Sequence, residues 1–174
     1  MTNYFELFDL PVSFHPDVDL VKKKYYGLSR QYHPDRFAQT GGSGMVEALQ
    51  MSAQVNGAFK VLKDSSATMA YVLKLHNLLE HDEKYSLPPA FLMEMMDLNE
   101  LVSDMEPSNT ATLQEAETTL NSYLQEWETE VQQLTTQYDA GDHGEPLLLK
   151  IKDCYFRKKY LLRIKERVAT FATH

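Results

Sequence analysis

The sequence contains a single cysteine, Cys154, among its 174 residues. One cysteine excludes an internal disulfide framework and any Cys-x-x-Cys metal site. No apolar run approaches the roughly 20 residues that a membrane-spanning helix needs. The first residues also lack the basic-then-apolar pattern of a secretory signal. We therefore expect a protein of a reducing compartment, most simply the cytoplasm, with no metal, no cofactor and no membrane association.

Basic residues are missing from residues 85–149, which contain thirteen acidic residues. Positive charge gathers in two other segments. Residues 20–36 carry five basic side chains and one acid, and residues 150–167 carry eight basic side chains and two acids. The formal net charge of the chain is −8 at pH 7, so its overall field repels nucleic acid. Blocks of opposite sign indicate charge-complementary surfaces, some internal and some for partner proteins.

The alternating pattern typical of strands is also missing, and helical spacing of apolar residues replaces it. We expect an all-α protein in which a short apolar-rich segment at residues 3–10 is stopped by Pro11 and helices follow from 17 or 19 to 32, at about 45–63, and from 65 to about 76. Three further helices follow Pro88-Pro89, the last two separated by a turn at residues 139–146. Residues 77–89 are expected to form a connection.

Helical spacing also predicts which side chains are buried. In the first half these are Val21, Tyr25, Leu28, Tyr32, Leu49, Ala53, Ala58, Val61, Leu62, Tyr71, Val72 and Leu75. In the second half they are Phe91, Met95, Leu98, Val102, Met105, Leu113, Leu120, Leu124, Trp127, Val131, Leu134, Tyr138, Leu147, Ile151, Cys154, Leu161, Ile164 and Val168. Two of these rows repeat every seven residues, which predicts the seam of an antiparallel bundle or coiled coil, and with three helices in this half we expect an antiparallel three-helix bundle.

The tripeptide His-Pro-Asp occurs twice, at residues 15–17 and 33–35. The first copy precedes the basic helix, where proline and aspartate commonly start a helix. The second copy ends that helix, because the residue before a proline is pushed out of the α region. A proline there also limits the backbone freedom of His33 and Asp35, which favours their presentation to a partner.

Three segments, in matching order and spacing, resemble the J-domain family: Tyr4–Phe8, Arg30–Phe37 and Val55–Asp64. The resemblance covers residues 1–76 and implies a four-helix domain that docks on a DnaK-type ATPase and stimulates it. The implied docking residues are Lys22, Lys23, Lys24, Tyr26, Arg30, His33, Pro34, Asp35 and Arg36. Without the motif, the lysine run would be as consistent with an ordinary solvated helix face. Gly57 departs from the pattern, since glycine inside a helix costs up to ~1 kcal/mol relative to alanine.

Two later segments, Tyr71–His76 and Pro89–Glu100, resemble the HscB-type J-domain co-chaperones of iron–sulfur cluster assembly. The resemblance implies a J-domain at 1–76, a linker at 77–89 and, at 90–174, a C-terminal three-helix bundle that binds the scaffold protein. The implied partners are a DnaK/HscA-type chaperone and an IscU-type cluster scaffold, and the implied role is ATPase activation, not catalysis. We expect a monomer.

A helical wheel indicates where the scaffold protein would bind. Residues Leu92, Met93 and Met96 fall outside the stripe that begins at Phe91, and Phe156 projects opposite the buried stripe of its own helix. The acidic rim of this candidate surface consists of Asp97, Glu100 and Asp104. An exposed apolar patch with a charged rim is typical of a protein interface. The alternative is that Leu92 and Met96 pack against the J-domain or another helix.

Two other functions fit the sequence less well. One is a J-domain co-chaperone for a different client protein. The other is an enzyme that uses the Cys154 thiol or a pair of carboxylates, although no nucleophile, base and orienting group are recognisable together. Cys154 lies on an apolar stripe, which favours a packing role. Residues 40–44 lack the flanking strand and Lys-Ser/Thr of a phosphate loop, so we expect an ordinary loop there.

Overall fold

The computed structural model describes residues 2–39, 41–106 and 108–173, and these contain helices and no strand. The all-α expectation is therefore confirmed. The chain divides into two compact units, residues 1–76 and 77–174. Within the described ranges, no helix combines the length and the apolar character required to cross a bilayer.

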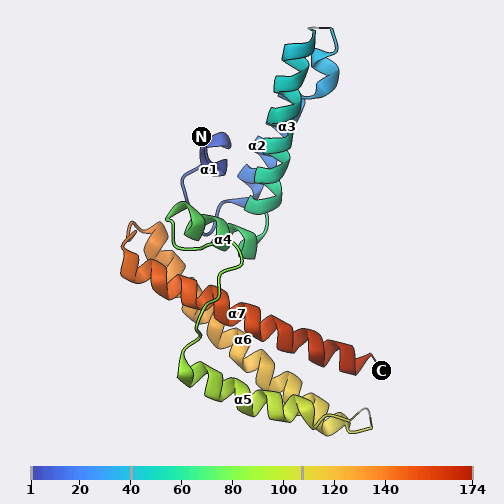
Figure 1. The fold of residues 1–174 in the computed structure, drawn as a ribbon, viewed down its shortest axis with the longest axis vertical. Helices are drawn as coiled ribbons and strands as arrows, with labels where there is room; N and C mark the ends of the chain where they lie inside the picture. The colour runs from blue at the N-terminus through green and yellow to red at the C-terminus, as the bar shows by residue number, and fades with distance from the viewer. Residues whose placement is uncertain (1, 40, 107, 174) are drawn as a thin grey trace. The chain divides into compact units, whose positions relative to one another are not determined.

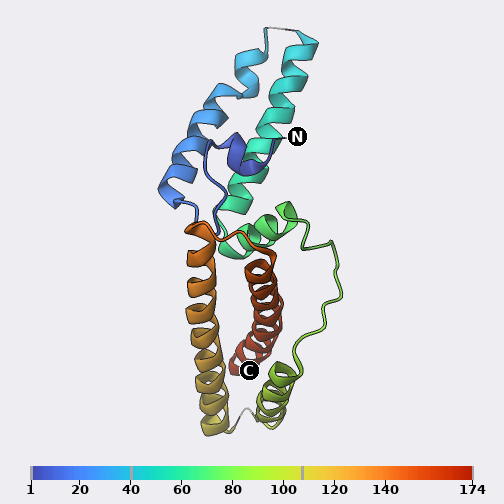
Figure 2. The same cartoon turned by 90° about the vertical axis from the view of Figure 1, so that its left-hand side faces the viewer.

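The first unit contains four α-helices and one short 3-10 helix (Figures 1 and 2). In chain order they are α1 (Tyr4–Leu7), α2 (Val18–Gln31), η1 (Pro34–Phe37), α3 (Gly42–Leu62) and α4 (Ser65–Leu75). Helices α2 and α3 lie side by side and antiparallel, as Figure 2 shows. The core between the helices contains Phe5, Phe8, Val21, Val55, Ala58, Leu62, Val72 and Leu73.

Side-chain caps fix where these helices begin. The Asp17 carboxylate accepts hydrogen bonds from the backbone N–H groups of Asp19 and Leu20, so the first His-Pro-Asp copy does cap α2. Asp64 caps α4 in the same way, one residue before the expected serine start. Helix α3 begins at Gly42, three residues earlier than predicted, so most of the expected loop is helical, and Thr40 lies outside the described residues.

The predicted buried face of α3 is partly wrong. Leu49 is 51% exposed and Ala53 is exposed, whereas Ala48 and Val55 are fully buried. Apolar residues surround the first half of α3, so the periodicity of the sequence did not single out one face. Leu75 is also exposed, and of the predicted α2 stripe only Val21 is fully buried.

Helix α1 is tied to the rest of the first unit through two tyrosines. The Tyr4 and Tyr71 rings stack with centroids 4.7 Å apart, and the Tyr71 hydroxyl accepts a hydrogen bond from the Tyr4 backbone N–H at 2.9 Å. A Cβ atom on Gly57 would lie 3.0 Å from the Tyr4 hydroxyl oxygen. The glycine within α3 therefore makes room for Tyr4, at the expense of helix propensity.

The second unit is a bundle of α5 (Pro89–Ser103), α6 (Thr110–Asp139) and α7 (Glu145–Ala172). Helices α6 and α7 form a long antiparallel pair, and α5 packs along both (Figures 1 and 2). The predicted stripes of α5 and α7 are confirmed, because all of their members are buried. The α6 rows are buried except at Leu113 and Leu124, which are half-buried. At the centre of the bundle, the Trp127 indole N–H donates to the Cys154 carbonyl oxygen at 2.7 Å.

Candidate partner-binding surfaces

The second His-Pro-Asp copy forms an exposed corner at the end of α2. His33 is the N-cap of η1, and its Nδ1 accepts a hydrogen bond from the Asp35 backbone N–H at 3.3 Å. The Asp35 carboxylate lies 3.5 Å from the same nitrogen. The two side chains are 58% and 91% exposed. The corner is therefore held by its own local contacts and by the fixed φ of Pro34, while its polar groups stay accessible.

A surface pocket of about 480 Å³ lies beside this corner. It is lined by Tyr26, Ser29, Arg30, His33 and Arg36. Four of these five residues were predicted as docking residues. Tyr26 and Arg30 lie four positions apart on one face of α2, whereas His33 and Arg36 belong to η1 and its N-cap. Ser29 was not predicted, although it lies three positions after Tyr26 on α2. The Arg36 guanidinium donates to the Arg30 carbonyl oxygen at 3.4 Å, which links the loop to the helix end.

The three predicted lysines of α2 differ in their surroundings. Lys22 and Lys23 are exposed. The Lys24 ammonium lies 3.4 Å from the Asp9 carboxylate, and its side chain is 39% exposed. A surface ion pair of this kind contributes little to stability, but it partly offsets the positive charge of Lys24. The positive charge of this surface is therefore carried mainly by Lys22, Lys23 and Arg30 of α2 and by Arg36 of η1.

On the second unit, α5 presents apolar side chains to the surface. Leu92, Met93 and Met96 are 40%, 68% and 62% exposed, whereas their neighbours Phe91 and Met95 are buried. Asp97, Glu100 and Asp104 are exposed as well. The six side chains therefore lie on the surface of the bundle and do not fill the space between its helices, which leaves an apolar patch with an acidic rim.

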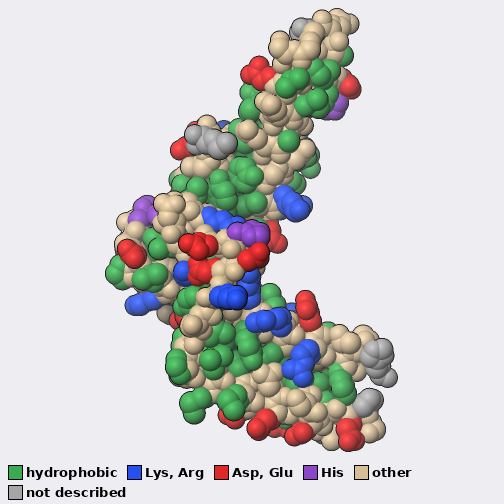
Figure 3. All heavy atoms as spheres, viewed as in Figure 1, with side chains coloured by type: hydrophobic (Ala, Val, Ile, Leu, Met, Phe, Trp, Pro, Cys, Tyr) green, Lys and Arg blue, Asp and Glu red, His purple; other side chains and the backbone are tan. Residues whose placement is uncertain are grey.

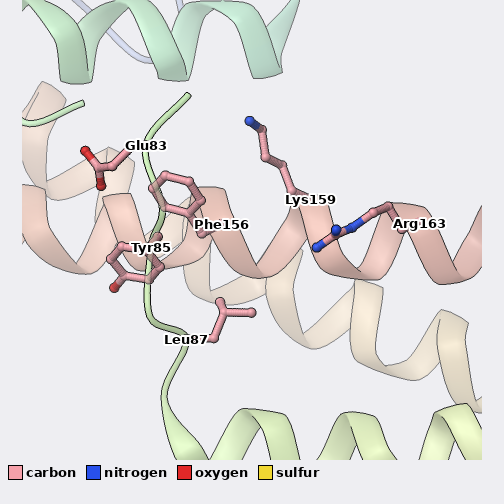
Figure 4. Close-up of a pocket in the computed structure, with 6 residues that line it drawn as sticks. All are labelled: Glu83, Tyr85, Leu87, Phe156, Lys159 and Arg163. Atoms are coloured by element: carbon pink, nitrogen blue, oxygen red, sulfur yellow. The ribbon is translucent and has the colours of Figure 1, made fainter. Parts of the chain in front are cut away.

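Phe156 is in a different situation from that predicted. Its ring is half-buried and stacks on the Tyr85 ring, with centroids 4.4 Å apart and planes 7° apart. Both rings line a pocket of about 420 Å³ on α7, together with Glu83, Leu87, Lys159 and Arg163 (Figure 4). One face of Phe156 is thus covered by the segment that precedes α5. The sequence predicts only a connection for that segment, closed by Pro88-Pro89.

Hydrogen bonds and ion pairs attach this segment, residues 83–87, to α7. The Tyr85 hydroxyl donates to the Asp153 carboxylate at 2.8 Å, and the Lys152 ammonium lies 2.8 Å from the Glu83 carboxylate. Burial, together with the hydrogen bond to Asp153, raises the pKa of Tyr85 to about 12. The hydrogen bond from Lys152 lowers the pKa of Glu83. Arg157 completes the cluster by pairing with Asp153 and with Glu130, each at 2.8 Å.

The structure offers no support for chemistry at Cys154. Its side chain is completely buried, and burial raises the pKa of the thiol to about 12. A thiol that stays protonated at neutral pH is a poor nucleophile. Across the described ranges, no group of three or more histidine, cysteine, aspartate or glutamate side chains is placed to hold a metal ion.

The chain is all-helical. One unit carries an exposed His-Pro-Asp corner, and the other is a helical bundle with an exposed apolar patch. These features together are typical of a J-domain adaptor protein. The family model described as the HSCB C-terminal oligomerisation domain matches residues 87–169. The co-chaperone protein HscB homolog of Haemophilus ducreyi is 32% identical over 174 residues, covering 95% of each chain. The chain belongs to the HscB co-chaperone family.

Two further comparisons agree with this assignment. The HscB homolog of Vibrio cholerae strain M66-2 is 40% identical over 99 residues, a match that spans 56% of this chain and 58% of that protein. The crystal structure of human co-chaperone protein HscB superposes with a TM-score of 0.76 at 27% identity, covering 98% of this chain and 82% of the human one.

Proposed function

We propose that this protein stimulates ATP hydrolysis by a DnaK/HscA-type chaperone through residues 1–76. We propose further that residues 90–174 bind an IscU-type iron–sulfur cluster scaffold and deliver it to that chaperone. The observation that carries the first half is the exposed corner of His33, Pro34 and Asp35, which adjoins a pocket lined by Tyr26, Arg30 and Arg36. Family membership supports the pairing of the two roles.

The charges of α2 suit an acidic surface on the chaperone. Lys22, Lys23, Arg30 and Arg36 are all exposed, the first three on α2 and Arg36 on η1. Such charges accelerate encounter with an oppositely charged partner more than they add to final affinity. The corner itself needs little reordering on binding, because η1 and the His33–Asp35 contacts already hold it.

The exposed α5 side chains support the second half of the proposal. Methionine is unbranched and polarisable, so Met93 and Met96 can adapt to an irregular partner surface. The acidic residues around them would exclude partners that are acidic at the same place. Burial of Leu92 and Met96 by the scaffold would remove apolar surface from water without any change in the bundle core.

The two His-Pro-Asp copies provide a matched test of the chaperone-binding site. We expect His33→Gln to abolish stimulation of the chaperone's single-turnover ATP hydrolysis, and His15→Gln to leave it unchanged. Both histidines are exposed, so neither change should alter thermal unfolding measured by circular dichroism. Normal stimulation by the His33→Gln protein would contradict the proposed docking site.

A binding measurement tests the identity of the client. Purified scaffold protein should bind the wild-type chain, and Met96→Ala should weaken that binding. ATPase stimulation without any affinity for the scaffold would leave a J-domain co-chaperone that serves a different client.

A further inference from the structure

The pocket on α7 contains two basic side chains that have no acidic partner. Lys159 and Arg163 both line it, and among the described residues neither forms an ion pair or a hydrogen bond. The neighbouring bases of the same helix are different, since Lys152 pairs with Glu83 and Arg157 with two carboxylates. The charges of Lys152 and Arg157 are thus offset by carboxylates of the bundle, whereas the charges of Lys159 and Arg163 can bind a ligand from outside it.

Aromatic rings hold the two cations without neutralising them. The Lys159 ammonium lies 4.8 Å from the Tyr155 ring centroid and 5.7 Å from that of Phe156. The Arg163 guanidinium lies 5.3 Å from the Tyr160 ring centroid. Cation–π contacts of this kind orient a charge and reduce its mobility, but they leave its full positive sign for another ligand.

The rest of the pocket is aromatic and aliphatic apart from one carboxylate, that of Glu83, and it is held in place. Its remaining lining consists of the stacked Tyr85 and Phe156 rings, Leu87, and Glu83, whose carboxylate is already bound by Lys152 at 2.8 Å. In Figure 4 the Tyr85 and Phe156 rings face each other, and Lys159 and Arg163 follow along α7. Because Tyr85 is also hydrogen-bonded to Asp153, the pocket exists before any ligand arrives.

The free charge at this pocket is positive, whereas the rim of the α5 patch is negative. Figure 3 shows basic side chains gathered over α7 and acidic side chains along α5, with hydrophobic side chains between them on the same face. Leu92 and Met96 are exposed apolar residues of α5. A partner that covers both helices would therefore meet a basic edge and an acidic edge at fixed positions, and this polarity can set its orientation.

We infer that Lys159 and Arg163 bind an acidic side chain of the scaffold protein, whose adjacent apolar group enters the pocket formed by Tyr85, Leu87 and Phe156. This inference rests on the proposed function, because it assigns a second contact to the same client. Carboxylates are the appropriate ligands, since arginine can bind a carboxylate in bidentate fashion and lysine adds a point charge beside it.

The test is the affinity of the full-length chain for purified scaffold protein, measured by calorimetry at low and high salt. Lys159→Glu with Arg163→Glu should weaken binding about tenfold or more at low salt, and less at high salt, where charges are screened. Lys150→Glu with Lys165→Glu is the matched control, because both residues are exposed bases of α7 outside the pocket. The control should lose clearly less affinity than the pocket variant at low salt, and at high salt it should bind within about twofold of wild type, because charges outside the interface are then screened.

A second variant guards against misfolding. Lys159→Gln with Arg163→Gln removes the charge and keeps most of each side-chain stem, and we expect a smaller loss in the same direction. Equal losses in the pocket variant and the control would overturn the inference, because they would reflect net charge alone. Wild-type affinity in the pocket variant, combined with a loss in Met96→Ala, would also overturn it while leaving the proposed function in place. Failure of the wild-type chain to bind the scaffold would overturn both.

Discussion

Two adjacent methionines of α5 allow the core and the candidate scaffold-binding surface to be separated in one experiment. Met95 is 0% exposed and Met96 is 62% exposed. Truncation of a buried methionine to alanine costs about 2–5 kcal/mol, from lost apolar burial and from the cavity that remains. Truncation of an exposed side chain outside any special contact changes stability by about 0.5 kcal/mol or less.

The expected result is that Met95→Ala destabilises the bundle by at least about 2 kcal/mol, whereas Met96→Ala leaves its stability unchanged and weakens scaffold binding. Trp127 is the only tryptophan and is 4% exposed within the bundle, so its fluorescence during a urea titration reports the unfolding of this unit. A comparable loss of stability in both variants would refute the assignment of Met96 to a free surface. An unchanged urea midpoint for Met95→Ala would refute the packing of α5.

Two further predictions concern the stability of each unit. Gly27→Ala should stabilise the first unit by about 0.5–1 kcal/mol through helix propensity, because a Cβ there meets nothing within 4 Å. Gly57→Ala should raise the free energy of unfolding clearly less, because Tyr4 must move to make room for the new Cβ. Equal increases for the two variants, in urea titrations followed by circular dichroism, would contradict this. In the second unit, folding raises the pKa of Cys154 from 9.0 to about 12 and the pKa of Tyr85 from 10.0 to about 12. Between these values the folded state keeps two protons that the unfolded chain has released. The free energy of unfolding should therefore fall as pH rises from about 9 to 12. Tyr85→Phe should flatten the fall in Trp127-detected urea midpoints, and an identical slope in that variant would contradict the assignment.

Long amphipathic helices made most of the second unit predictable. Each turn of α5 and α7 repeats the same core face, so the pattern identifies that face even where one position is ambiguous. Every predicted buried residue of these two stripes is buried. The grouping of Tyr26 and Arg30 could be predicted for a similar reason, since they share one face of α2, and the His-Pro-Asp motif added His33 at the end of that helix. Their roles in binding remain predictions.

Features that depend on distant partners could not be predicted in this way. The Tyr85–Phe156 stack joins a segment without periodicity to a helix far along the chain, and Lys24 is paired with an aspartate outside its own helix. The buried face of α3 was misassigned because apolar residues surround its first half, and Ala48 and Val55 are buried where α3 packs against the other helices of its unit. Tertiary contacts, which a local pattern does not contain, decide such positions.

The most direct test of the proposed function is steady-state ATP hydrolysis by the DnaK/HscA-type chaperone in the presence of this protein, with and without the scaffold protein. We expect stimulation by this protein that rises further when the scaffold is added, and that requires His33. If ATP hydrolysis is stimulated neither with nor without the scaffold protein, the proposed function is contradicted.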